Sequence, residues 1–226
     1  SHIGNFRTFI FEDLLKRWLL HLGYDVTHVM NITDVDDKTI KKSIRLKLDL
    51  EKITDKYISE FMSDISWLDL HPADYFPKAT DYISDMISMI NNLIRNKMAY
   101  IGEDKSVYFD ISSFKDYGKL ANLKLTKDQK SNLKGLQDEY NSNSPRDFAL
   151  WKARKKNDGN VFWDSPWGQG RPGWHIECSA MSTKILGNHF DIHCGGVDNI
   201  FPHHENELAQ SVGANGNNFV NYWVHS

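Results

Sequence analysis

The sequence has 226 residues, of which 40% are hydrophobic and 25% charged, with seven Trp, nine Tyr and twelve Phe. This composition excludes a disordered chain and fits one large globular domain, or one domain that carries an insertion. The formal net charge of -3 gives no electrostatic sign of a nucleic-acid partner, since such domains are usually basic. No apolar run approaches 18 residues and no secretion leader opens the chain, so we expect a soluble protein of the cytoplasm.

The first predicted element is a helix over residues 5–22. Its apolar residues recur at four-residue spacing, beginning with Phe6, Ile10, Leu14 and Trp18. An adjacent apolar stripe widens this face so far that we expect the helix to be buried on several sides. Gly23 is a stop signal, and the Val- and Ile-containing residues 25–33 predict a strand. A buried helix followed by a short apolar strand is typical of an α/β fold with a parallel sheet.

The middle of the chain has a different pattern. It contains two amphipathic helical segments, a short hairpin, and a polar loop or frayed helix, over residues 52–68, 80–98, 100–111 and 124–146. We interpret residues 35–145 as an insertion within an α/β domain whose halves are residues 1–34 and 146–226. The second half returns to short strands, predicted over residues 148–152, 190–193 and 219–224, and to a helix over residues 202–212.

Four residues at the start of the first helix, His2-Ile3-Gly4-Asn5, form a candidate phosphate site. A helix N-terminus presents unpaired backbone N–H groups and partial positive charge, and both bind phosphate. Gly4 would let a ligand approach the backbone, and His2 and Asn5 would add side-chain donors. Taken alone, these four residues favour a plain helix cap.

A second polar run, residues 31–38 (Asn-Ile-Thr-Asp-Val-Asp-Asp-Lys), lies where the predicted strand ends. Ligands of α/β folds bind at strand ends, and three acidic groups in four positions could bind Mg²⁺. The simpler interpretation, which we favour, is that Asp34 or Asp36 caps the helix that follows.

The strongest chemical pattern joins Cys178 to residues 201–207 (Phe-Pro-His-His-Glu-Asn-Glu). Pro202 near a helix start places His203 and Glu207 four residues apart on one face. An imidazole and a carboxylate at that spacing can bind one ion, and a soft cysteine thiolate favours Zn²⁺ over Mg²⁺ or Ca²⁺. Three protein ligands leave one position open, as in chemically active zinc sites. A His-rich helix start beside a buried thiol is the alternative.

Several other side chains could be ligands or structural groups. The two cysteines are too few for a disulfide framework, and Cys194, beside two glycines, is interpreted as a small buried thiol. His204 is an alternative to His203, but the residue four positions on is Leu208, which cannot bind a metal. Three more side chains flank predicted strand ends or glycine-rich turns and are structural if taken singly, namely Trp174, His193 and Asp198.

Two basic clusters stand out: Lys41, Lys42, Arg45 and Lys47 in one, and Arg154, Lys155 and Lys156 in the other. We interpret each as a solvated face or loop rather than an RNA contact, because charge runs of this kind are usually solvated. Charge by itself therefore does not identify a nucleic acid as a partner.

Four motifs, in order along the chain, resemble those of cysteinyl-tRNA synthetases. They are residues 2–9, residues 31–38, residues 171–181 (Arg-Pro-Gly-Trp-His-Ile-Glu-Cys-Ser-Ala-Met) and residues 201–210. The last two are long enough to be highly specific, and together the four spread over nearly the whole chain. The nearest relative of that family, the cysteine ligase of mycothiol synthesis, shares the zinc chemistry and much of the fold.

The resemblance implies a class I synthetase, with a Rossmann-type (HUP) catalytic domain interrupted by a mainly helical connective insertion. It implies that His2, Gly4 and Asn5 contact ATP, with Asn5 in place of the second His of the family's His-Ile-Gly-His signature. His2 and Asn5 would then be catalytic, while His193 and Asp198 would lie near the aminoacyl-adenylate.

The same resemblance implies that Cys178, His203 and Glu207 bind Zn²⁺, and that Thr33 and Trp174 line the cysteine pocket. The family's fourth zinc ligand, its Lys-Met-Ser-Lys-Ser loop and its helical tRNA-binding domains are not in this sequence, so we expect the fragment alone to be impaired or inactive. The implied partners are ATP with Mg²⁺, L-cysteine and tRNA(Cys), and the implied state is a monomer without a membrane partner.

Three functions are compatible with these observations. The first is ATP-dependent activation of cysteine and its transfer to tRNA(Cys), and the second is transfer to a small acceptor such as an amino sugar. The third is a non-catalytic zinc- or nucleotide-binding module that kept the fold. Zinc would explain how cysteine is selected over serine, because a thiolate binds zinc much better than an alcohol does.

Overall fold

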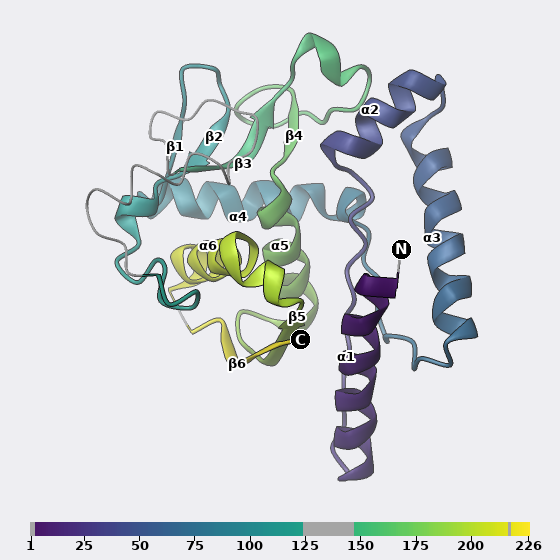
Figure 1. The fold of residues 1–226 in the computed structure, drawn as a ribbon. Helices are drawn as coiled ribbons and strands as arrows, with labels where there is room; N and C mark the ends of the chain where they lie inside the picture. Colours follow the sequence, from purple (N-terminus) through teal and green to yellow (C-terminus); the bar gives the residue numbers. More distant parts are fainter. Residues whose placement is uncertain (1–2, 124–146, 217) are drawn as a thin grey trace.

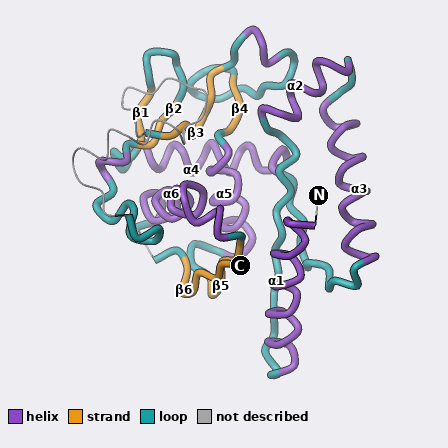
Figure 2. The backbone as a smooth tube through the Cα atoms, in the orientation of Figure 1, coloured by secondary structure: helices purple, strands orange, loops and turns teal. Residues whose placement is uncertain are grey.

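A computed structural model of the protein describes residues 3–123, 147–216 and 218–226 (Figure 1). It is a mixed arrangement of helices and short strands, in which helices predominate (Figure 2). None of the described helices is long and apolar enough to cross a membrane. His2 and the polar segment 124–146 lie outside the described residues.

The described α-helices are α1 (Ile3–His21), α2 (Asp37–Leu46), α3 (Leu50–Trp67), α4 (Ile83–Arg95), α5 (Trp174–Leu186) and α6 (Glu205–Asn215). In Figure 1, α1 and α3 lie on one side and α4, α5 and α6 lie together on the other. The helix predicted over residues 5–22 is confirmed as α1, and Gly23 follows it with a φ of +85°, a left-handed conformation that favours glycine. The two amphipathic helices predicted in the middle block correspond to α3 and α4.

The described strands form two sheets. The antiparallel sheet contains, in spatial order, β1 (Ala99–Ile101), β2 (Val107–Phe109), β3 (Phe148–Ala153) and β4 (Gly170–Pro172). The second sheet pairs β5 (Phe190–Gly195) in parallel with β6 (Val220–His225), and α6 connects them in the sequence as in a βαβ unit. The predicted hairpin and the three predicted strands of the second half are confirmed, although β5 is only partly buried.

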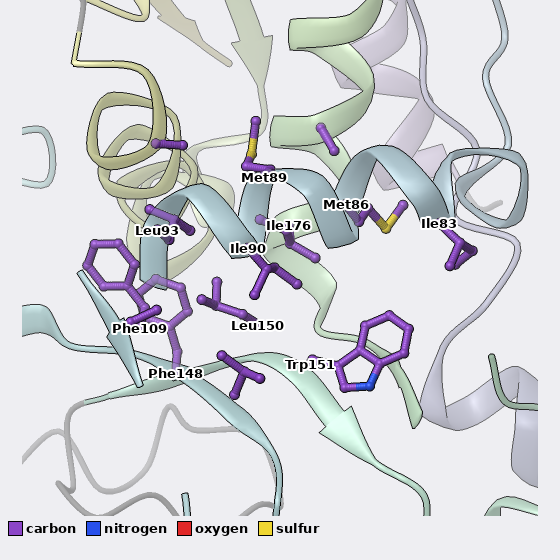
Figure 3. Packing of buried hydrophobic residues seen from close by; sticks show 14 of the residues in the cluster. Ile83, Met86, Met89, Ile90, Leu93, Phe109, Phe148, Leu150, Trp151 and Ile176 are labelled. Carbon is purple, nitrogen blue, oxygen red and sulfur yellow. The ribbon is translucent and has the colours of Figure 1, made fainter. Parts of the chain in front are cut away.

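The core lies where α4 and the antiparallel sheet meet α5 and α6 (Figure 3). One face of α4 supplies apolar side chains at spacings of three and four residues, namely Ile83, Met86, Ile90 and Leu93. The sheet supplies Leu150 and Trp151, and α5 supplies Ile176, all three of them fully buried. The rings of Phe109 and Phe148 stack across β2 and β3, with centroids 5.0 Å apart. This packing fixes α5 against α4 and the sheet.

The segment predicted as an insertion contributes directly to this core. α4 lies within residues 35–145, yet its buried side chains belong to the same hydrophobic cluster as those of α5 and α6. The division of the chain into residues 1–34, 35–145 and 146–226 stays a prediction, since a shared core neither requires nor excludes it.

The prediction that the first helix is buried on several sides is wrong for the described residues. Its large apolar side chains are about half exposed: Ile10 (44%), Leu14 (63%) and Trp18 (56%). α1 contacts its neighbours along a narrow edge, where Phe6 stacks on Phe61 of α3 and the buried Lys16 donates a hydrogen bond to the carbonyl of Pro72. Helical periodicity shows how wide an apolar face is, but it cannot show whether anything covers it.

The strand predicted over residues 25–33 does not join either sheet. The segment is extended and lies parallel to residues 74–79, but the two form only the isolated bridges Val29–Tyr75 and Ile32–Lys78. The amide of Ile32 donates to the carbonyl of Pro77, and Pro77 has no N–H with which to continue the ladder. The expected parallel pairing is therefore reduced to single bridges here.

We expect Ile90→Ala to lower the free energy of unfolding by about 2–5 kcal/mol, because the removed atoms leave a cavity in a fully buried part of the core. Leu48→Ala, at a side chain that is 48% exposed, is the matched control and should cost less than about 1 kcal/mol. Urea unfolding followed by circular dichroism measures both. Equal effects of the two substitutions would contradict the placement of α4 in the core.

Candidate metal centre

Three predicted ligands from two helical segments meet in one place. Cys178 lies on α5, Glu207 lies on α6, and His203 lies in a short helical turn (Ile200–His204) that runs directly into α6. One ligand atom of each residue lies within 4.8 Å of the other two. The start of α5 is pressed against β3, since a Cβ at Gly173 would lie 1.9 Å from the carbonyl oxygen of Ala149. Only glycine permits this approach, which determines the position of the helix that carries Cys178.

Glu207 is at the centre of the cluster and is fully buried. Its Oε2 accepts a hydrogen bond from His193 Nε2 at 2.9 Å. Its Oε1 lies 2.9 Å from His203 Nε2, but among the described residues it has no hydrogen-bond partner. A buried carboxylate oxygen without a donor, beside an imidazole nitrogen and a thiol, fits a site that holds a cation. The sulfur, nitrogen and oxygen donors together fit Zn²⁺ better than Mg²⁺ or Ca²⁺.

The electrostatics of the cluster agree with a bound cation. Burial raises the pKa of the Cys178 thiol well above its usual range, and the Glu207 carboxylate raises that pKa further. Burial also acts to raise the pKa of Glu207, but the neighbouring His193 and His203 outweigh it and hold that pKa well below its usual range. The carboxylate is therefore ionised, whereas the thiol becomes a thiolate ligand at neutral pH only with a metal ion beside it.

His175 fixes the orientation of the His203 ring and was not predicted from the sequence. The Nδ1 atoms of the two imidazoles are 2.8 Å apart. Burial lowers the pKa of His175 well below its usual range, so its ring is neutral and its Nδ1 can accept a hydrogen bond. With a metal ion bound, His203 would then keep its proton on Nδ1 and offer the lone pair of Nε2 to the ion beside Glu207 and Cys178. The signal that could have identified His175 is its place three residues before Cys178 on one helix.

A second group of candidate metal ligands shares Glu207 with the first. His193, His204 and Glu207 also offer ligand atoms within 4.8 Å of one another. His204 was considered as an alternative to His203, and its Nδ1 lies 2.8 Å from His225 Nε2 instead. Burial lowers the pKa of His204 to about 3, so this ring is neutral. Cys194 belongs to neither group of candidate ligands among the described residues, and burial raises the pKa of its thiol to about 12.

Two residues of the predicted cysteine pocket lie beside this cluster. The exposed ring of Trp174 stacks on His203, with ring centroids 4.3 Å apart. Thr33 hydrogen bonds to the carboxyl group of Glu177, whose side chain is buried and whose Oε2 has no partner among the described residues. Glu177 was not singled out in the sequence, although it immediately precedes Cys178.

The acidic run at residues 31–38 is occupied by structural contacts. Asp36 caps α2 by accepting the amide of Thr39, as the cap interpretation predicts. Asp34 accepts hydrogen bonds from Thr80 in the short 3-10 helix (Ala79–Tyr82) before α4. Asp37 forms ion pairs with Lys152 on β3 and Arg171 on β4. These contacts give no support to a Mg²⁺ site formed by this run alone.

The predicted nucleotide-binding residues come together in part. Gly4 and Asn5 are exposed in the first turn of α1, whereas His2 lies outside the described residues. The loop after β5 approaches this helix, because a Cβ at Gly196 would lie 2.3 Å from Asp198 Oδ1 and 3.7 Å from Thr8 Oγ1 of α1. The first turns of α1 and the carboxyl end of β5 therefore face each other, as a nucleotide site at a strand end requires.

The comparisons with known proteins give one family. A family model described as tRNA synthetases class I (C) catalytic domain matches residues 1–226. Proteins from Chlamydia felis and Brachyspira hyodysenteriae, both named cysteine–tRNA ligase, are 53% and 55% identical to this chain over 227 and 230 residues. Each match covers 100% of this chain and 48% of the relative, so the chain spans about half the length of these curated relatives.

One solved structure has a similar fold. A crystal structure from Campylobacter jejuni, provisionally described as an arginyl-tRNA synthetase, matches with a TM-score of 0.52 and 15% sequence identity. The match covers 100% of this chain and 51% of that one. At this identity the likeness concerns the fold alone.

We expect Cys178→Ser to weaken zinc binding by about 100-fold or more, because the substitution removes the soft ligand from a buried site. Cys194→Ser is the matched control and should leave zinc content unchanged. Metal analysis after dialysis against a graded series of chelator concentrations measures both. Full zinc retention by the Cys178 variant would contradict the ligand assignment.

We expect His175→Leu to weaken zinc binding by about 10- to 100-fold, because His203 loses the acceptor that fixes its tautomer. His189→Leu, at an exposed histidine hydrogen-bonded to Asn221, is the control and should have no effect. The same chelator competition applies, and an unchanged affinity in the His175 variant would show that the contact does not orient the ligand.

Proposed function

We propose that this chain, which belongs to the family of class I tRNA synthetase (C) catalytic domains, is the cysteine-activating part of a cysteine–tRNA ligase. The observation that carries the proposal is the buried cluster of Cys178, His203 and Glu207, whose donor atoms suit a zinc ion. A metal site that includes a soft sulfur ligand is useful in a domain that activates an amino acid with a thiol, because the metal can bind that thiol.

The cluster would supply selectivity for cysteine. When bound, Zn²⁺ would take the substrate thiolate as a further ligand, which the hydroxyl group of serine replaces poorly at neutral pH. The residues of the chain prepare this site: Glu207 supplies negative charge, and His175 sets the tautomer of His203. Trp174 and Thr33 would border the substrate, since the one stacks on His203 and the other hydrogen bonds to the residue before Cys178.

The start of α1 would bind the phosphates of ATP, with Mg²⁺ accompanying the nucleotide. Gly4 permits close approach to the backbone amides of the first turn, and Asn5 and His2 would donate hydrogen bonds to phosphate oxygens. His193 and Asp198, which lie on β5 and in the loop after it, would contact the adenylate. Support comes from the approach of Gly196 to Thr8, which brings the loop and α1 together.

The reaction would proceed in two steps. A carboxylate oxygen of cysteine attacks the α-phosphorus of ATP in line, and the bond to the β-phosphate oxygen breaks with release of pyrophosphate. A ribose hydroxyl of tRNA(Cys) then attacks the carbonyl carbon, and AMP leaves. The contribution of the protein to such a transfer is positioning and charge stabilisation, which the helix N-terminus and His2 would supply.

The domain organisation forms part of this proposal. The parallel pair of β5 and β6, which α6 connects, would be the parallel unit of a Rossmann-type half. Residues 35–145 would be the connective insertion, within which α4 also packs into the core. Transfer to an amino sugar would suit the same metal chemistry, but the relatives named above favour tRNA as the acceptor.

We expect the full-length protein to catalyse cysteine-dependent ATP–pyrophosphate exchange, and His2→Ala to lower its kcat by about 100-fold because this substitution removes a donor to the transition-state phosphate. The KM for cysteine should stay within about twofold, since the proposal gives His2 a role at the phosphates and none at the amino acid. His21→Ala, at the other end of α1, is the control. Equal effects on kcat and on cysteine binding would count against the phosphate role.

A further inference from the structure

The carboxylate of Glu207 has two oxygens, and they face different imidazoles. Oε1 lies 2.9 Å from His203 Nε2, whereas Oε2 accepts a hydrogen bond from His193 Nε2 at 2.9 Å. His204 lies beside His193, with ring centroids 4.5 Å apart. Ligand atoms of His193, His204 and Glu207 lie within 4.8 Å of one another. This second group shares only Glu207 with the candidate zinc ligands described above, so one carboxylate can bridge two ions.

The turn before α6 supplies one histidine to each group. Neighbouring residues in a helical turn point in different directions, so His203 and His204 cannot face the same way. His203 lies in the group that contains Cys178. His204 is buried on the side of the β5–β6 sheet, where its ring centroid is 5.2 Å from that of Trp223 on β6. The two adjacent histidines therefore approach Glu207 from two sides.

His204 has the same kind of orienting contact as His203. Its Nδ1 lies 2.8 Å from Nε2 of His225 on β6, just as Nδ1 of His203 lies 2.8 Å from Nδ1 of His175 on α5. A histidine that binds a metal through one nitrogen usually hydrogen bonds through the other, which fixes its ring. Because the contact to His225 engages Nδ1, Nε2 is the nitrogen of His204 that would bind a metal.

Close packing at the end of β5 fixes the position of the His204 ring. A Cβ at Gly195 would lie 2.6 Å from His204 Cε1 and 2.9 Å from His204 Nε2. A larger residue at this position would therefore displace the ring. Gly195 lies on the same strand as His193, two residues further on. The missing side chain thus allows His204 Nε2 to reach the end of β5, next to His193.

The donors of the second group suit Zn²⁺. Two imidazole nitrogens and one carboxylate oxygen are a ligand set that catalytic zinc sites use, with one position left open. Mg²⁺ and Ca²⁺ prefer oxygen ligands, so two nitrogen donors disfavour both ions. The second group differs from the first in having no thiolate, which is the ligand that most favours a soft metal.

Two features make the second group the weaker of the two. An ion bound there must displace the hydrogen bond between His193 and Glu207. It must also share the Glu207 carboxylate with the first ion, and the ions of two-metal sites lie only about 3.5–4 Å apart, so their charges repel. Zinc would therefore fill the first group at low concentration and the second group only when zinc is in excess.

His193 connects the second group to the nucleotide site of the proposed function. It lies on β5, and Gly196 in the loop that follows approaches Thr8 of α1. An ion bound to His193 Nε2 and Glu207 would hold this imidazole at the metal and prevent its contact with the adenylate. It would also compete with the first ion for the charge of Glu207. Both effects oppose the activation of cysteine.

We propose that His193, His204 and Glu207 form a second, weaker zinc site beside the first, and that zinc bound there inhibits cysteine activation. The site is inferred from the arrangement of these side chains, whereas the inhibition rests on the function proposed above. Removal of the weaker ion by a chelator restores activity, because the tighter ion stays bound.

The first test measures zinc uptake by the full-length protein. Equilibrium dialysis against buffers of increasing free zinc, followed by metal analysis, should show one ion bound at low zinc and a second at higher zinc. His204→Gln should bind one ion fewer than the wild type at high zinc, whereas Cys178→Ser should lose the tighter ion. His189→Gln, at an exposed histidine just before β5, controls for uptake by surface histidines and should bind both ions.

The second test measures inhibition of cysteine-dependent ATP–pyrophosphate exchange. The free zinc concentration that halves the rate should rise about 100-fold or more in His204→Gln, which lacks a ligand. His225→Leu keeps all three ligands and removes only the contact that orients His204, so its rise should be about tenfold. Each variant is compared with its own rate at low zinc, where its circular dichroism spectrum and its tighter ion show that it is folded.

Three outcomes would count against these claims, and they are distinguishable. Equal zinc uptake by the wild type and His204→Gln would overturn the second site. A second ion that leaves the exchange rate of the wild type unchanged would overturn the inhibition. Absence of exchange by the wild type at every zinc concentration would instead contradict the proposed function, and the uptake measurement would still decide whether the second site exists.

Discussion

The buried carboxylate of Glu207 is the constraint on which the arrangement of the metal centre depends. An ionised carboxylate with no access to water is strongly destabilising unless positive charge or a metal compensates it. His193 approaches one of its oxygens and His203 the other, each at 2.9 Å. Trp223 and Trp174 stack on these two rings and hold them in place. One charge thus determines where β5, α5 and the turn before α6 meet.

The same arrangement connects the two chemical tasks of the proposed enzyme. The candidate metal ligands lie on α5, on α6 and in the turn before α6. The loop after β5 lies near Thr8 in the first turns of α1. His193 connects the two parts, because it lies on β5 and its Nε2 hydrogen bonds to Glu207. In the proposed function the substrate thiol would bind at the metal and its carboxylate would react near the start of α1. The shared core of α4, α5 and the antiparallel sheet keeps these parts in register.

Local signals in the sequence predicted much of the fold and the proximity of the candidate ligands. The four-residue spacing of His203 and Glu207 predicted that the two side chains lie together, because residues at that spacing share a helix face, and their Nε2 and Oε1 atoms are 2.9 Å apart. The burial of α1 and the strand pairing of residues 25–33 were not predicted correctly. Both depend on a second segment that must pack on the helix or hydrogen bond to the strand. His175 and Glu177 were missed for a related reason: their roles consist of contacts to His203 and Thr33, and only the fold reveals these contacts.

The central claim is that the cluster around Glu207 holds a zinc ion that takes the substrate thiolate as a ligand. X-ray absorption at the zinc edge of the full-length protein tests it directly, with and without bound cysteine. The account predicts one additional sulfur neighbour at about 2.3 Å when cysteine is added, and no such change with serine. A sulfur count that stays the same with both amino acids would contradict it.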